Sequence, residues 1–158
     1  MASKKKKGKK SRSRKRRPPV SRHSKLISKM EKQGLLEDTV IIHEPRGKEK
    51  MSEVLEEFAQ PYLDLVDDSF EMQNKVIAMA ALAWNFTLLP RKERKAAVED
   101  LISSLSLQDE RAEEDTRQII KEMIKRKKRY FRANKRFILS YDMSKTKDGF
   151  YLSVASTL

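Results

Sequence analysis

A nearly continuous apolar segment, VIAMAALAWNFTLL, runs from Val76 to Leu89 and is bounded by Lys75 and Pro90. It is shorter than the roughly 20 residues that a helix needs to cross a bilayer. A helix that is apolar on all sides belongs in the middle of a bundle, where neighbours cover every face. The segment therefore predicts a buried central helix over about residues 70–89. Within it, Trp84 is expected to be a packing residue rather than part of a ligand pocket.

Helical spacing of apolar residues flanks this central segment on both sides. Residues 52–66 read as one helix, and Pro61 is expected to kink or break it. Two further helices are predicted over about residues 90–105 and 109–134. The last of these begins with acidic residues and ends with basic ones, an order that complements the helix dipole at both ends.

Several residues mark where the predicted helices begin. Asp68 with Glu71 resembles a capping box before the central helix. Pro90 suits the first turn of the following helix. Ser106 and Asp109 mark the start of the last one.

The apolar period changes from that of a helix to two after residue 136. Large apolar and aromatic residues alternate with others from Phe137 to Met143 and again from Phe150 to Val154. Asp148-Gly149 supplies turn chemistry between these stretches, so they predict a β-hairpin that packs one face on the helices. The sequence thus predicts a mostly α fold, a domain of about four helices with a C-terminal β-hairpin, preceded by a disordered basic N-terminal arm.

The net charge of +13 is concentrated at the start of the chain. The first 25 residues hold 13 lysines and arginines and no acidic residue, and the remainder is neutral overall. Repulsion and little burial leave nothing to offset the entropy of ordering such a segment. We therefore divide the chain into a disordered basic arm (1–20), a segment with a short helix, an extended run and a linker (21–50), and a helical domain ending in the hairpin (51–158).

Within the middle segment, Ser24 is a candidate cap for the short helix and Gly34 a natural stop. The extended run is Thr39–Ile42, which could add a third strand to the hairpin.

The arm is the first candidate site. We expect its cations to contact the phosphates of RNA or DNA, with strong salt dependence. The alternatives are a solubilising tail or, in a eukaryote, a nuclear localisation signal. The candidate nucleic-acid-binding residues are Lys4, Lys5, Lys6, Lys7, Lys9, Lys10, Arg12, Arg14, Lys15, Arg16 and Arg17.

The basic end of the last predicted helix is the second candidate. Tyr130 and Phe131 follow a basic run there, so one aromatic ring could stack on a base. We favour the plainer interpretation, in which a solvated helix end carries charges that suit its dipole and the aromatic residues are core. The candidate residues are Lys125, Lys128, Arg129 and Arg132.

A helix-turn-helix motif is a weaker hypothesis for the junction LLPRKERK, which contains Arg91, Lys92, Arg94 and Lys95. The turn has no glycine, and the helix that follows carries an apolar stripe. A recognition helix instead exposes polar residues near its N-terminus to read bases.

Nothing in the sequence favours catalysis. There is no cysteine, and the two histidines, His23 and His43, both precede the helical domain. No GxxxxGK or GxGxxG motif occurs, and the paired acids fall at helix starts, where capping explains them. We expect no catalytic residue, no metal and no cofactor.

We therefore expect a non-enzymatic protein that associates with RNA or DNA through its arm, while the folded body supplies partner specificity. The alternative is a protein–protein adaptor whose body binds a protein partner and whose basic tail serves for targeting. Association of the arm with an anionic membrane surface is a weaker option. The expected compartment is the cytoplasm, or the nucleus in a eukaryote, because no secretory signal is visible.

Overall fold

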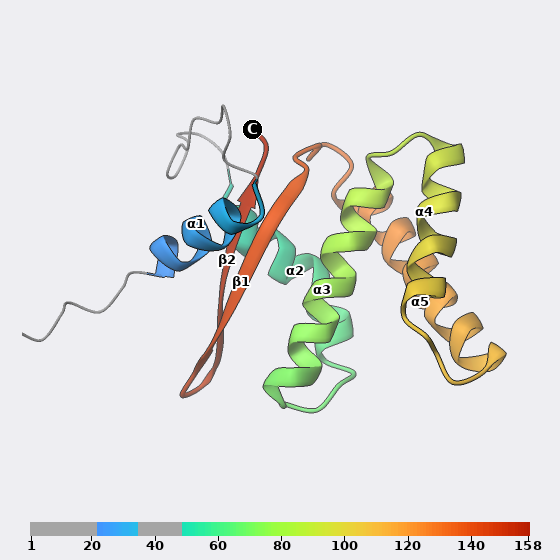
Figure 1. Cartoon of the computed structure of the whole chain (residues 1–158), viewed down its shortest axis with the longest axis horizontal. Coiled ribbons are helices and arrows are strands. Elements are labelled where there is room, and N and C mark those ends of the chain that lie inside the picture. The colour runs from blue at the N-terminus through green and yellow to red at the C-terminus, as the bar shows by residue number, and fades with distance from the viewer. Residues whose placement is uncertain (1–21, 35–48) are drawn as a thin grey trace, which may run out of the picture.

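The computed structural model describes residues 22–34 and 49–158. The predicted basic arm, the extended run at 39–42 and His43 lie outside the described residues. Within the described ranges the chain forms five helices and one two-stranded antiparallel sheet (Figure 1). This confirms the predicted fold class, a mostly helical protein with a C-terminal hairpin.

The elements follow one another along the chain with all helices before the hairpin. The four helices predicted after residue 50 are present, and one shorter helix precedes them. The helices are α1 (Arg22–Lys32), α2 (Met51–Leu63), α3 (Phe70–Thr87), α4 (Arg91–Ser104) and α5 (Glu110–Tyr130), and the strands are β1 (Ile138–Thr146) and β2 (Gly149–Ser156).

The central helix α3 contacts α2, α4, α5 and β1, as its apolar sequence predicts. Ile77 and Trp84 are fully buried. The ring of Trp84 meets the rings of Phe58 and Phe131 edge-on, with centroids 5.5 and 5.8 Å away. Leu82 is 38 % exposed, so one side of α3 still reaches the surface.

Pro61 was expected to kink or break its helix, and the break is wrong because α2 continues to Leu63. Proline has no backbone N–H, so the carbonyl of Glu57 lacks its donor within the helix. Arg126 of α5 replaces that donor. Its Nη2 donates to Glu57 O at 3.2 Å, and its Nε donates to Phe58 O at 3.0 Å. The gap in the hydrogen bonding of α2 is thus an attachment point for α5.

Ser69, rather than Asp68, caps α3. The Oγ of Ser69 accepts a hydrogen bond from Met72 N at 3.2 Å. Asp67 Oδ1 accepts from Ser69 N at 3.1 Å, which helps hold the cap residue in its extended conformation. Three successive residues could cap this helix, and the bond from Asp67 selects the third.

The starts of the next two helices are close to the prediction. Pro90 is the N-cap of α4 and lies just before its first residue, Arg91. Asp109 caps α5 as predicted, since its Oδ1 accepts from Ala112 N at 2.8 Å. At its other end, α5 stops at Tyr130, earlier than the expected limit at residue 134.

The hairpin packs one face on the helices. Tyr141 lies opposite Val154, and Met143 lies opposite Leu152. All four side chains join the core that α2 and α3 form, so the predicted alternation holds here. At the tip, Gly149 opens β2 with φ of 149°, a conformation that a side chain makes unfavourable.

The alternation that was predicted to run unbroken from Phe137 is interrupted. A register shift lies between Ile138 and Ser140. As a result Ile138 is 5 % exposed and joins the core, whereas Phe137 is 37 % exposed. Asn85 of α3 fixes this arrangement, because its Nδ2 donates to Ile138 O at 2.8 Å and its Oδ1 accepts from Ile138 N at 2.9 Å.

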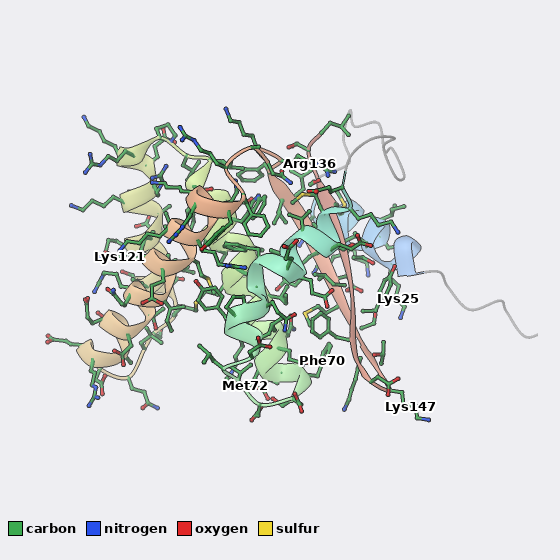
Figure 2. The ribbon with its side chains drawn as sticks, turned by 180° about the vertical axis from the view of Figure 1, so that it is seen from behind. Lys25, Phe70, Met72, Lys121, Arg136 and Lys147 are labelled. Carbon is green, nitrogen blue, oxygen red and sulfur yellow. The ribbon has the colours of Figure 1, made fainter. Side chains whose placement is uncertain are left out.

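Helix α1 covers the other face of the hairpin, as the opposite views in Figures 1 and 2 show. Its Leu26 and Met30 are buried. Lys29 Nζ donates to Tyr141 O at 2.7 Å. The helix begins at Arg22, before the expected cap at Ser24, and Gly34 follows its end with φ of 70°.

Candidate nucleic-acid interface

The structure separates the two groups of candidate residues. The arm candidates, Lys4 to Arg17, lie outside the described residues. Lys125, Lys128 and Arg129 lie on the last turns of α5, and Arg132 follows the helix. All four of these side chains are exposed.

The basic run of α5 also contains a residue with a structural role that its sequence conceals. Lys127 is 3 % exposed, and its Nζ donates to Phe131 O at 2.9 Å and to Asn134 O at 2.6 Å. It also lies 4.3 Å from the centroid of the Trp84 ring. Burial lowers the pKa of Lys127, and the charge of Lys135 lowers it further. Lys127 thus closes the C-terminus of α5 and is not available to a ligand.

Lys128, one position further, lies within electrostatic reach of the start of α4. Burial lowers the pKa of Lys128, and the positive charges of Arg94 and Arg91 lower it further. The two helices therefore place three cations of like sign near one another. An anion between them would relieve this repulsion.

Arg94 is held in place at this site. Its guanidinium donates to the carbonyls of Phe86, Thr87 and Leu89 at 3.0 to 3.1 Å. Phe86 and Thr87 end α3 and Leu89 follows it, at a place where carbonyl groups lack the amide donors of a further helical turn. Arg94 thus links α4 to the end of α3. The helix-turn-helix hypothesis did not predict this structural role.

Further along α4 and α5, two lysines lie near a carboxylate that already has an arginine partner. Glu99 of α4 accepts hydrogen bonds from Arg117 of α5, with Nε–Oε1 of 2.9 Å and Nη2–Oε2 of 3.1 Å. These bonds lower the pKa of Glu99 most, and the charges of Lys121 and Lys95 lower it further. Because Arg117 already engages Glu99, the two lysines add positive charge without a close partner.

We use the name basic strip for five side chains along the seam between α4 and α5. Lys121, Lys125 and Lys128 share one face of α5 at helical spacing. Within residues 22–34 and 49–158, no member forms an ion pair with a carboxylate. Figure 2 places Lys121 on the opposite side of the molecule from Lys147 at the hairpin tip. The members are Arg91 and Lys95 of α4 and Lys121, Lys125 and Lys128 of α5.

The two adjacent aromatic residues at the end of α5 have different environments. The ring of Phe131 packs against Phe58 with a centroid distance of 5.6 Å. Tyr130 is 62 % exposed. The guanidinium carbons of Arg126 and Arg129 lie 5.4 and 5.2 Å from the centroid of its ring. The expectation that both aromatics are core therefore holds for Phe131 and is wrong for Tyr130.

A shallow hollow of about 420 Å³ lies near the end of α5 and is lined by residues that include Glu49, Asn134, Lys135 and Leu158. Arg136 also lines it, and its Nη1 donates to Glu49 O at 2.8 Å. The lining offers no nucleophile paired with a base. Among the described residues no three metal-binding side chains gather at one place.

Comparison of the chain with protein-family models, curated proteins and solved structures finds no match. None of the described helices combines the length and apolarity that crossing a membrane requires.

Proposed function

We propose that this protein binds nucleic acid without catalysing a reaction, with the basic strip as a fixed phosphate-binding surface and the arm as a second one. The observation that carries the proposal is the unpaired charge of the basic strip, where Lys128 lies close to two arginines of α4. Phosphate groups are the anions that match a row of such cations.

The two elements would act differently. The arm carries 11 positive charges in 20 residues and attracts any polyanion without regard to sequence. The basic strip instead has positions set by helix packing, and Arg94 beside it is tied to three carbonyls. Fixed spacing allows the body to prefer one shape of nucleic acid over another, which is the basis for partner specificity.

The distribution of charge along α5 also favours nucleic-acid binding near its C-terminal end. Its first turn is acidic, with Glu110 and Glu113, and its last turn is basic, with Lys127, Lys128 and Arg129. A nucleic acid is repelled from the start of α5 and attracted to its end. The acidic end therefore limits how far along the seam a strand can extend.

The test is a salt series with full-length protein and labelled RNA and duplex DNA. In the triple variant Lys121→Gln, Lys125→Gln and Lys128→Gln, binding should weaken. The plot of log affinity against log salt for duplex DNA should become less steep, by about 0.9 for each phosphate that the variant no longer neutralises.

A matched control removes the same charge elsewhere. Lys75, Lys145 and Lys147 are exposed lysines of α3 and the hairpin, outside α4 and α5, and their replacement by glutamine lowers the net charge equally. If this control weakens binding as much as the first variant, only net charge matters and the basic strip is not a site. If the wild-type chain binds neither RNA nor DNA at physiological salt, the proposed function is wrong and the adaptor hypothesis takes its place.

A further inference from the structure

The exposed ring of Tyr130 adds a second kind of contact at the end of α5. We propose that Tyr130 stacks on a base of single-stranded RNA or DNA, so that the substrate class of the site is single-stranded nucleic acid. This inference rests on the nucleic-acid function proposed above and assigns a recognition element that charge alone does not supply.

The ring of Tyr130 is exposed to solvent, whereas hydrogen bonds and packing hold the backbone around it. Lys127 donates to Phe131 O and Asn134 O, one and four residues after Tyr130. Phe131 is anchored among Phe58 and Trp84. Tyr130 therefore projects from a rigid helix end with 62 % of its surface exposed. A ring whose backbone is held in this way loses less conformational freedom when a base stacks on it than a ring on a mobile segment would.

Arg126 supports the ring from within the fold. Pro61 leaves the carbonyl of Glu57 without a donor, and Arg126 donates to that carbonyl and to Phe58 O. These two bonds hold its guanidinium near the ring of Tyr130. Arg126 is thus a positioning residue, and its cation strengthens binding of a base at the same ring.

Arg129 connects the ring to the basic strip. Its guanidinium lies over Tyr130, and it makes no ion pair with a carboxylate of the described residues. Successive residues of an α-helix are about 100° apart around its axis, so Arg129 lies between Tyr130 and Lys128. A strand whose base stacks on Tyr130 would pass Arg129 before its phosphates reach Lys125 and Lys128.

The single-stranded class follows from what a ring can reach. Bases in a duplex are paired and stacked on each other, and their faces are closed to a side chain that lies at the surface of a helix. Unstacked bases of a single strand expose both faces, and aromatic side chains bind them with little sequence preference.

The experiment compares full-length wild type with Tyr130→Ala on a labelled single strand of about 20 nucleotides, as RNA and as DNA, and on the matching duplexes. Loss of one stacked base should weaken single-strand binding about 5- to 150-fold. Because stacking involves no counterion release, the loss should be the same at every salt concentration, a parallel shift of the salt line. Duplex affinity should change by less than about twofold.

Two control variants separate stacking from damage to the fold. Tyr130→Phe keeps the ring and should retain single-strand affinity. Leu65→Ala truncates an apolar side chain that is 83 % exposed and should leave binding unchanged. The measurements with RNA and with DNA show whether the protein binds both kinds of single strand, as stacking on a ring predicts.

The outcomes distinguish this inference from the function on which it rests. Equal losses on single strand and duplex, or no loss on either, would overturn the stacking site while leaving the basic strip in place. A Tyr130→Phe variant as weak as Tyr130→Ala would also overturn it, because the hydroxyl and not the ring would then be the contact. Absence of binding to any nucleic acid overturns both proposals.

Discussion

Lys127 is a cation that the fold has removed from water. Its ammonium group is bonded to two backbone carbonyls and lies over an indole ring, and no carboxylate of the described residues pairs with it. Carbonyl dipoles and the face of tryptophan stabilise a cation only in part. Burial therefore lowers its pKa below the ordinary 10.5.

This shift predicts how stability depends on pH. Between the folded pKa of Lys127 and 10.5, the unfolded chain holds more protons than the folded one, so the free energy of unfolding rises with pH. The free energy of unfolding of wild type, minus that of Lys127→Met, should therefore increase as the pH rises from about 7 toward 10.5. Urea unfolding of both proteins across this range measures it. A difference that stays flat would mean that Lys127 titrates as it does in water.

Arg126 and Pro61 are coupled although they lie on different helices. Arg126→Met removes two donors and should lower the free energy of unfolding by about 2 kcal/mol. In a Pro61→Ala background the new N–H of residue 61 can serve Glu57 O, so the same change should cost about 1 kcal/mol less. A double-mutant cycle by urea unfolding measures this coupling. Additive effects would show that Glu57 O has another donor.

At the scale of elements, the hairpin depends on α3 for its attachment. Asn85 offers one donor and one acceptor to Ile138, as a neighbouring strand would, and Trp84 Nε1 donates to Arg136 O at 2.8 Å. These three bonds join the end of α3 to the start of β1. They occur where the register shift turns Ile138 into the core.

Asn85→Ala should therefore loosen the hairpin more than it disturbs the helices. Both backbone groups of Ile138 would lose a partner, at a cost of about 2 kcal/mol. Hydrogen exchange should accelerate at Ile138 while the amides in the middle of α3 remain protected. Asn85→Asp, which keeps the acceptor and loses the donor, should lie between wild type and alanine. Equal acceleration throughout α3 would contradict a local attachment.

The elements themselves could be predicted because each has its own period. Apolar spacing located the four helices after residue 50, and alternation located the hairpin. The register shift at Ile138 could not be found in this way, because it depends on a side chain of α3. For the same reason the basic run KRKKR gave no sign that Lys127 is buried and Arg126 is attached to α2. Adjacent cations of one type are indistinguishable until the packing of the helix is known.

At the scale of the whole molecule, the net charge is concentrated at one end of the chain. The first 25 residues, which comprise the arm and the start of α1, hold the excess of 13 charges, and the remainder balances to zero. Within that neutral remainder the cations of the basic strip are gathered at one seam. The arm was visible in composition alone, whereas the seam combines α4 with α5 and required the structure.

The arm should behave as a sum of interchangeable charges. Replacing any single lysine or arginine between Lys4 and Arg17 with glutamine should lower nucleic-acid affinity only slightly. Replacing all of them should flatten the salt dependence and remove most of the affinity. Filter binding across a salt series measures both effects. A single arm substitution that removes most of the affinity would contradict this additive behaviour.

The position of Trp84 has a spectroscopic consequence. It is the single tryptophan of the chain, it is fully buried, and its indole N–H is bonded to the residue that leads into β1. Its fluorescence therefore reports on one place only, the junction of α3, α5 and the hairpin. An emission maximum at short wavelength would signal the docked hairpin, and a shift to longer wavelength would signal its release, with no engineered label.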